Sequence, residues 1–523
     1  MNLLFLGIFF AFGISLTSFQ TLPAMELLRI SQRSSEGIDP NLSYLPYKHL
    51  VNMFAPDYFG NQATGNFWSD GNYTNTAAYT GIITFVFASI AVIKRINRKK
   101  VKYFTAVFFL GLILTLKSPI SEFTYMIKLI GSEAASTTRS LVLVNFALAG
   151  LFGIGIETLE KIKRKDLFVL IIPWTVLIGA LLYSLFNEKP VGYRNLIFPG
   201  ILLGFVTSLL VSLLKIKNNK YIKLSGVIVA ILVVIELFRF GWKYTPFSPK
   251  EYIFPETDLT TYLQKDKLNR IHFGEVIPMN MWVSYGLPSL GSYDAVYPSI
   301  IAEYIAANNS STAEATMMGR IATVDNSSGV LFDMAGINRL LSLSSEYDIY
   351  DSDYSKLFND DKVYVYKNNS AIDRIKLYSN WKVIDDENKH LAYILDNNFD
   401  LEEEVIIFED VNLSQSEDVS LAGDILAKEY ESQEITIKVN TKRDALLFLS
   451  DTFYPGWEAY VDGEKEKIVR ANYAFRAVPV RSGSKTVKFV YNPKSFKIGL
   501  WISGVTFIFL IAINVYSYKK TLI

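Results

Sequence analysis

Long apolar runs alternate with short basic segments over the first 240 residues, and one more apolar run closes the chain. A helix that crosses a bilayer needs roughly 17–25 apolar residues. Eight runs reach or approach this length, of which the third and seventh are short: 3–19, 77–93, 103–116, 141–156, 167–186, 196–214, 224–237 and 498–516. This pattern predicts a polytopic α-helical membrane protein with about eight transmembrane helices.

The basic segments orient these helices. The sequences "KRINRKKVK", "EKIKRKD", "KIKNNKYIK" and "YKK" follow the second, fourth, sixth and eighth runs, whereas the other connections hold few Lys or Arg. Lys and Arg collect in short cytoplasmic loops. We therefore expect both termini in the cytoplasm. A membrane domain would span 1–240, with seven helices and outer loops at 20–76 and 117–140, and the last helix would lie in 495–523.

The stretch 241–494 would then be extracytoplasmic. Its first part, 241–400, mixes helical and strand patterns and predicts an α/β region. From 401 to 494 short runs such as "ITIKVNT" and "KTVKFVY" alternate polar and apolar residues, which predicts a β-sandwich. Asp462-Gly463 between two such runs is a strong signal for a tight hairpin. Trp457 and Tyr460 either bind carbohydrate or are packing aromatics of these strands.

Charged residues in the two outer loops are candidates for chemistry. Asp57 and Asp70 lie in the first loop, which is long and rich in turn-forming and aromatic residues; Glu122, Glu133 and Arg139 lie in the second. A charge at the mouth of the membrane is costly unless it is paired or faces water. Arg139 would suit a phosphate, because a guanidinium binds phosphate in a bidentate way. Turns with an interfacial aromatic belt and side chains that reach the headgroups remain the alternatives.

Glu236 and Arg239 lie one helical turn apart near the end of the seventh run. Side chains three residues apart on a helix are neighbours. We expect them to form a local ion pair at the helix end rather than a site.

Composition excludes several classes of function. The net charge of +1 gives no basic excess to neutralise nucleic acid, and the absence of cysteine excludes disulfides and thiolate metal sites. His49, His272 and His390 show no metal-ligand spacing, so we interpret them as structural. Phosphate-loop, dinucleotide and nucleophile-elbow motifs are missing as well.

Several segments, in order along the chain, carry a family resemblance: "APDYFGN…GNYTNTAAYTGI", "TTRSLVLVNFALAGLFGIGIE", "YGLPSLGSYDAVYP", "LFDMAGINRLLS" and, above all, "YPGWEAYVDGEKEKIVRANYAFRAVPVRSGSKTVKFVYNPKSFKIGLWIS". They resemble the YfhO family of bacterial membrane proteins. The resemblance implies a GT-C-like glycosyltransferase fold in the bacterial plasma membrane. It also implies transfer of a sugar from a polyprenyl-phosphate carrier to an envelope polymer such as lipoteichoic acid.

That chemistry needs a carboxylate base for the acceptor hydroxyl and cationic or metal stabilisation of the leaving phosphate. The resemblance places the catalytic acid of the family in a first outer loop that precedes the position matching residue 1. We therefore expect the chain to lack N-terminal helices, either as a gene fragment, as one half of a split protein whose N-terminal half is a second polypeptide, or as a degenerate member of the family. Asp57, Asp70 and Glu122 are the acidic candidates for contact with a metal or the acceptor, and Arg139 is the candidate for binding the carrier phosphate. Whether a divalent metal takes part stays open.

Two other functions remain open. A membrane-anchored scaffold would bind carbohydrate through 241–494 without catalysis. A transporter or flippase would require charges or broken helices near the middle of the bilayer. Pro173 and Pro199 lie inside apolar runs, but the runs hold almost no charge near their centres.

Overall fold

The computed structural model describes residues 3–34, 44–127, 136–216, 218–245, 247–315, 319–344, 353–360, 362–396, 399–416 and 422–522. The chain forms two compact units. One, the helical unit, is Gly37–Pro249; the other combines Met1–Glu36 with Lys250–Ile523. The first predicted membrane helix thus belongs with the C-terminal part of the chain and not with the other helices of the predicted membrane domain.

Helices form over all eight predicted apolar runs. They are α1 (Leu3–Leu16), α4 (Ile82–Arg95), α5 (Lys99–Thr115), α7 (Leu141–Ile156), α8 (Ile171–Phe186), α10 (Ile197–Leu213), α11 (Asn219–Tyr244) and α18 (Lys494–Leu522). Five described helical segments are long and apolar enough to cross a membrane: Thr137–Ile156, Arg164–Phe186, Pro190–Leu213, Lys220–Trp242 and Lys494–Lys519. The predicted count of eight spans is therefore not confirmed.

Helix α4 forms the core of the helical unit. Most of its apolar side chains, among them Ile82, Val86 and Phe87, are fully buried. Helix α7 packs closely against α4 at Gly155. A Cβ atom on this residue would lie only 2.0 Å from the Phe87 carbonyl oxygen. Small residues permit such close helix packing in membrane proteins. At 14 residues, α4 is about 21 Å long, so it is shorter than a bilayer core of about 30 Å.

Two ion pairs join basic residues at the end of α4 to acidic residues that follow α7. Lys94 Nζ lies 2.6 Å from the buried carboxylate of Asp166, and Arg95 lies 2.7 Å from Glu157. The C-terminal end of α4 and the segment after α7 therefore lie side by side. This arrangement agrees with the alternation of basic loops in the sequence.

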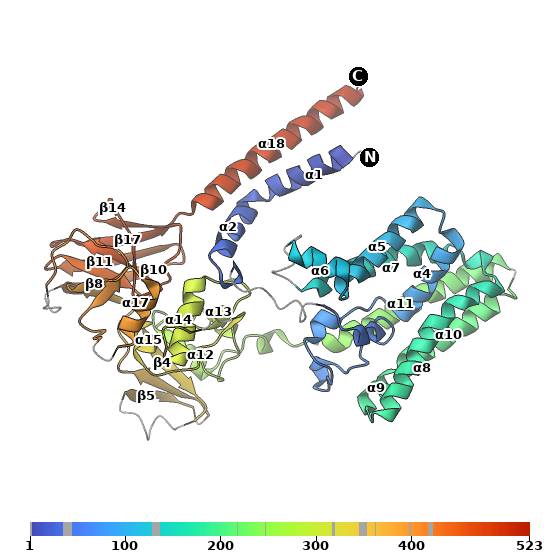
Figure 1. Cartoon of the computed structure of the whole chain (residues 1–523), viewed down its shortest axis with the longest axis horizontal. Coiled ribbons are helices and arrows are strands. Elements are labelled where there is room, and N and C mark those ends of the chain that lie inside the picture. The colour runs from blue at the N-terminus through green and yellow to red at the C-terminus, as the bar shows by residue number, and fades with distance from the viewer. Residues whose placement is uncertain are drawn as a thin grey trace. The chain divides into compact units, whose positions relative to one another are not determined.

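The N-terminal and C-terminal helices pack together (Figure 1). Helix α1 bends by 78° into α2 (Ser18–Arg29). At this bend the Ser503 hydroxyl of α18 accepts the Phe19 N–H and donates to the Ser15 carbonyl, both at 3.2 Å. A Cβ on Gly499 would lie 2.3 Å from the Ser18 carbonyl oxygen, so the two helices are in backbone contact. Residues 20–29, expected in an outer loop, are helical instead.

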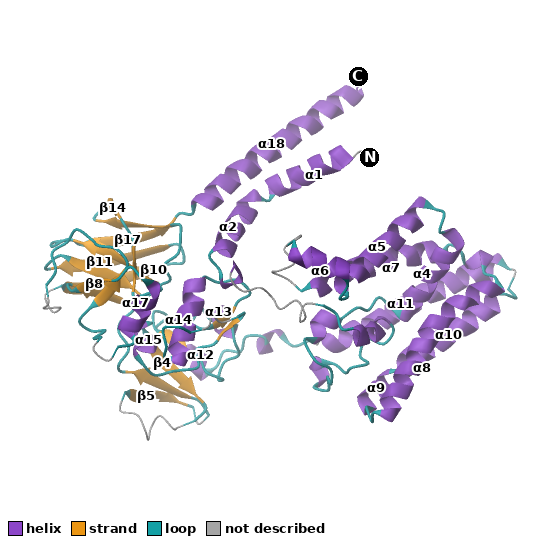
Figure 2. Cartoon of the chain, viewed as in Figure 1, coloured by secondary structure: helices purple, strands orange, loops and turns teal. Residues whose placement is uncertain are grey.

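In its described residues, the strand-rich domain, residues 250–493, contains three larger sheets and a two-stranded one (Figure 2). The first is mixed: β1 (Arg270–His272), β4 (Ile337–Ser342), β6 (Tyr364–Asn368) and β5 (Tyr354–Asn359). Short helices pack near it: α12 (Asp258–Leu263), α13 (Met281–Ser284), α14 (Ser299–Ser310) and α15 (Val330–Met334). The two-stranded sheet pairs β2 (Ser292–Tyr293) with β3 (Ile321–Ala322).

Two further sheets share one apolar core. One has the order β7 (Ile375–Tyr378), β12 (Ala445–Leu449), β16 (Phe475–Val480), β15 (Val469–Ala471), β9 (Val405–Ile407) and β8 (Trp381–Val383). The other has the order β10 (Gly423–Tyr430), β11 (Glu434–Thr441), β17 (Thr486–Tyr491), β13 (Trp457–Val461) and β14 (Glu464–Glu466). Side chains such as Leu447 and Phe489 fill the space between them. The expected boundary at residue 400 falls between strands of the first of these sheets.

The predicted hairpin is confirmed. Strands β13 and β14 pair with Val461 opposite Glu464, and Asp462 and Gly463 between them have φ angles of 50° and 92°. Two positive φ angles are what a tight two-residue turn between twisted strands requires.

Candidate functional site

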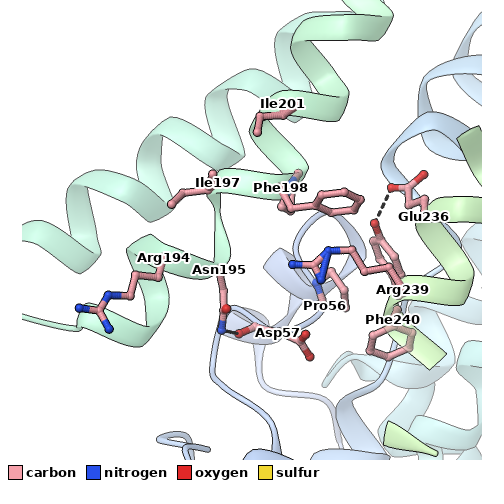
Figure 3. A pocket seen from close by; sticks show the side chains of 12 residues that line it. Pro56, Asp57, Arg194, Asn195, Ile197, Phe198, Ile201, Glu236, Arg239 and Phe240 are labelled. Atoms are coloured by element: carbon pink, nitrogen blue, oxygen red, sulfur yellow. Dashed lines mark hydrogen bonds between the residues drawn. The ribbon is translucent and has the colours of Figure 1, made fainter. Parts of the chain in front are cut away.

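A pocket of about 340 Å³ lies in the helical unit, beside α9 (Pro190–Asn195), α10 and α11 (Figure 3). Polar and apolar side chains share its wall. The lining residues are Pro56, Asp57, Tyr79, Arg194, Asn195, Ile197, Phe198, Pro199, Ile201, Glu236, Arg239 and Phe240. The pocket thus combines two carboxylates and two guanidinium groups with an apolar surface.

Asp57 is held by its neighbours. Its Oδ1 atom accepts hydrogen bonds from the Asn61 amide and the Tyr73 hydroxyl, both at 3.1 Å. The Asn195 side chain of α9 donates to the Asp57 backbone carbonyl. Burial, and next the charge of Asp57, raise the pKa of Tyr73, so this hydroxyl stays protonated and donates. Asp57 is therefore the sequence candidate that the fold brings into the pocket.

Glu236 has a role that the sequence did not indicate. Its Oε1 atom accepts the N–H of Ile82 at 2.7 Å and the hydroxyl of Tyr79. The carboxylate therefore caps the N-terminus of α4. Gly81, with φ +97°, makes room for it, because a Cβ there would lie 2.8 Å from Oε2. Oε2 itself is buried and has no hydrogen-bond partner among the described residues.

The expected ion pair between Glu236 and Arg239 is wrong. The Arg239 guanidinium instead lies 4.4 Å from the ring centroid of Phe198. Among the described residues no carboxylate forms an ion pair with Arg239 or Arg194. Figure 3 shows Arg239 on the same side of the pocket as Asp57, whereas the Arg194 guanidinium points away from them. Arg239 is thus the cation available to a ligand bound beside Asp57.

The other loop candidates that the structure describes, Asp70, Glu122 and Arg139, do not line this pocket. Asp70 is almost fully exposed and pairs with Lys48 at 2.8 Å. Glu122 lies in the first turn of α6 (Pro119–Met126), 3.8 Å from Lys117. Arg139 is exposed in a 3₁₀ turn, Thr137–Ser140. Glu133 falls outside the described residues.

In the strand-rich domain, Trp457 and Tyr460 face opposite sides of β13. Ala459, on the same side as Trp457, is fully buried in the core between the sheets. Trp457 is half-buried, with the Arg476 guanidinium 4.1 Å from the centroid of its ring. The Tyr460 hydroxyl lies on the other face and donates to Glu458 at 3.1 Å. The two aromatic side chains therefore cannot form one stacking platform.

The described histidines and carboxylates do not gather into a metal site. In the described part of the chain, no group of three or more His, Asp or Glu residues could hold an ion. His49 and His390 are fully buried. Each packs against an aromatic ring, His49 against Phe59 and His390 against Phe408. Burial is the main cause that lowers the pKa of each to about 4, as for neutral structural histidines.

Comparison with known proteins finds a family similarity for the C-terminal part of the chain. Residues 397–503 match the family described as bacterial membrane protein YfhO. Over this segment, the findings support a YfhO-family membrane protein. The "Uncharacterized protein YfhO" of Bacillus subtilis (strain 168) is 29% identical over 91 residues, which are 17% of this chain and 10% of that protein. The match thus spans about a tenth of that relative. No solved structure matches the chain.

The YfhO segment runs through most of the two sheets that share a core and into α18. The resemblance seen in the closing motif is confirmed there. For the segments before residue 397, including the loop that holds Asp57, it stays a prediction. The apolar helices and the family match together indicate a membrane protein of the bacterial cell envelope.

Proposed function

We propose that this YfhO-family protein takes part in cell-envelope glycosylation. It would transfer, or help transfer, a sugar from a polyprenyl-phosphate carrier to an extracytoplasmic polymer such as lipoteichoic acid. The observation that supports this function is the pocket that holds Asp57 and Arg239 next to an apolar wall. A lipid-linked sugar phosphate presents the matching groups: an anionic phosphate, sugar hydroxyls and a hydrocarbon chain.

In this proposal Arg239 binds the carrier phosphate. A guanidinium donates charge-assisted hydrogen bonds to phosphate oxygens, and such bonds are stronger than hydrogen bonds between neutral groups. Ile197, Phe198 and Ile201 offer the apolar surface for the first prenyl units. Asp57 would accept the proton of the attacking hydroxyl, because a general base must reach that proton within hydrogen-bond distance. The buried Oε2 of Glu236 would accept a hydrogen bond from a ligand hydroxyl.

The test measures both binding and transfer. Membranes that carry the chain receive a labelled polyprenyl-phosphate sugar, and bound donor and labelled polymer are quantified separately. Asp57→Asn should keep donor binding and abolish transfer. Asp70→Asn is the matched control, since Asp70 lies in the same loop, exposed and outside the pocket. Equal transfer by both variants and the unaltered chain would exclude Asp57 as the base.

A scaffold function is the second candidate. It is favoured by the position of the family match, which lies in the second half of the strand-rich domain and the start of α18 rather than in the helical unit. In that case the chain would present a polymer to another enzyme. Binding of polymer without transfer, unchanged by Asp57→Asn and Arg239→Gln, would favour the scaffold over the transferase.

A further inference from the structure

A second pocket, of about 410 Å³, lies at the end of the strand-rich domain where β17 passes into α18. Its wall includes the segment 453–459 and Lys494, the first residue of a candidate membrane span. Small-molecule sites commonly have volumes of about 300–1,000 Å³. A ligand in this pocket would lie at the membrane surface.

The loop that forms this pocket is fixed in place. Gly456 has φ +95°, and a Cβ at this position would lie 3.1 Å from Pro493 Cα. The Asn492 N–H donates to the Gly456 carbonyl at 2.6 Å. The backbone of the loop is therefore clamped against the segment that leads into α18.

Glu458 is the centre of a polar network on this rim. Its Oε1 atom accepts from Lys465 at 2.6 Å, and its Oε2 atom accepts from Asn492 and from Tyr460, each at 3.1 Å. These contacts, led by the hydrogen bond from Lys465, lower the pKa of Glu458 to about 2. An ionised carboxylate thus stands between an ammonium and an amide. Neighbouring acceptors and donors of this kind match the adjacent hydroxyls of a sugar.

A neighbouring hollow of about 430 Å³ shares two residues with this pocket, Glu458 and Asn492. Tyr460 lines the neighbouring hollow, and Trp457 lines the pocket itself. The two aromatics on opposite faces of β13 therefore border two adjoining hollows. Each can offer an apolar surface to a sugar ring.

The charges of this region favour a neutral ligand. Three of its cations already have partners: Lys465 pairs with Glu458, Lys467 with Glu409, and Arg476 with Asp451. Lys494 is a further cation of the pocket wall. Glu26 and Glu466 also line the pocket. With few unpaired cations, hydroxyl groups fit this wall better than a phosphate does.

We propose that the two hollows around Glu458 form one binding site for a neutral, hydroxyl-rich saccharide at the membrane surface. Glu458, Asn492 and Lys465 would hold the sugar hydroxyls, and Tyr460 and Trp457 would flank the rings. The proposed function contributes only the expected source of this saccharide, an envelope polymer. The site itself rests on the geometry of the strand-rich domain.

The test uses the full chain in lipid discs prepared without glycoside detergents, which would compete. The probes are maltose, gentiobiose, lactose and N,N′-diacetylchitobiose, and binding is followed by saturation transfer from protein to sugar protons. We expect at least one probe to bind, Glu458→Gln to weaken that binding about tenfold or more, and Tyr460→Phe to weaken it less. Glu434→Gln is the matched control, because Glu434 is half-exposed and paired with Lys488, and it lines neither hollow.

Binding of no probe, or equal binding by the Glu458→Gln and Glu434→Gln variants, would overturn the proposal. Displacement of the sugar by millimolar inorganic phosphate would also overturn it, because it would show an anion site. Asp57→Asn should leave saccharide binding unchanged. A failure of transfer with intact binding therefore counts against the proposed function alone.

Discussion

The carboxylate of Glu236 accepts the backbone N–H of Ile82 at 2.7 Å across 154 residues of sequence. The first turn of a helix leaves N–H groups without partners inside the helix. Glu236 of α11 thus stabilises the N-terminus of α4, the buried helix of its unit, and at the same time lines the pocket. The stability of the unit and the shape of the candidate site depend on the same side chain.

Replacing Glu236 should therefore destabilise the helical unit. We expect Glu236→Ala to lower the free energy of unfolding by about 1–3 kcal/mol, since it leaves the Ile82 N–H and the Tyr79 hydroxyl without an acceptor. Glu236→Gln keeps an oxygen in place and should lose less. Thermal unfolding in lipid discs measures both variants. Glu122→Ala, at an exposed side chain, is the control, and an equal loss for Glu122→Ala and Glu236→Ala would contradict the capping role.

Arg239 and Arg139 are competing candidates for the residue that binds the carrier phosphate. Arg239 lines the pocket, whereas Arg139, the candidate from the sequence, is exposed elsewhere in the unit. We expect Arg239→Gln to weaken binding of a labelled polyprenyl phosphate tenfold or more, because charge-assisted hydrogen bonds contribute about 1.5–3 kcal/mol. Arg139→Gln should change binding less than twofold. The reverse ranking in an equilibrium binding assay would place the phosphate at Arg139.

Local patterns in the sequence were sufficient for the helices and for the hairpin. Apolar runs predict helices because a helix that is buried or faces lipid needs apolar side chains. Asp462-Gly463 predicts a turn because few residue types adopt the positive φ angles of a tight hairpin. Helix length was less predictable: α4 ends after 14 residues. The packing of α1 and α2 against α18 joins opposite ends of the chain, which no local pattern can show.

The site was predictable only in part. Asp57 was identified by its place in a long polar loop, but Asp70 of the same loop lies outside the pocket, and the choice between them depends on long-range contacts such as that from Asn195. Glu236 and Arg239 were interpreted as a pair because their spacing permits one. A charge within a membrane span is a functional candidate. This rule could have singled out Glu236, whose carboxylate accepts the Ile82 N–H. The opposite faces of Trp457 and Tyr460 follow from the odd spacing of three along a strand.

A buried carboxylate joins separate sheets of the strand-rich domain. Asp451 contacts the guanidinium groups of Arg374, Arg476 and Arg270 at 2.6, 3.1 and 3.5 Å. Burial raises the pKa of Asp451, but the three positive charges outweigh this effect and hold the pKa below its usual range. We expect Asp451→Asn to lower the free energy of unfolding by about 3–5 kcal/mol, because it leaves buried positive charge without compensation.

The control for Asp451 is Asp424→Asn, an exposed carboxylate 3.2 Å from Lys442. Surface ion pairs contribute about 0–1 kcal/mol, so this variant should unfold almost as the unaltered chain does. Denaturant unfolding followed by tryptophan fluorescence compares the two. A loss below 1 kcal/mol for Asp451→Asn would show that the arginines find other partners or water.

His390 makes the strand-rich domain sensitive to mild acid. Its Nδ1–H donates to the Ile384 carbonyl at 3.2 Å, and its Nε2 accepts the Tyr473 N–H at 3.0 Å. A proton on Nε2 would remove this acceptor and place a charge against Phe408. Burial is the main cause that lowers the pKa of His390 from 6.5 to about 4.

The sign follows from where the proton binds. Above pH 6.5 the histidine is neutral in both the folded and the unfolded chain, so its full contribution to stability is present. Between pH 6.5 and 4 the unfolded chain binds a proton that the folded chain does not, and stability falls by up to about 3 kcal/mol. We expect His390→Gln to be less stable at pH 7.5 but to lose less on acidification to pH 4.5. His272, whose pKa burial also lowers, should leave a residual slope, and an unchanged pH dependence in the variant would show that His390 is protonated in the folded protein.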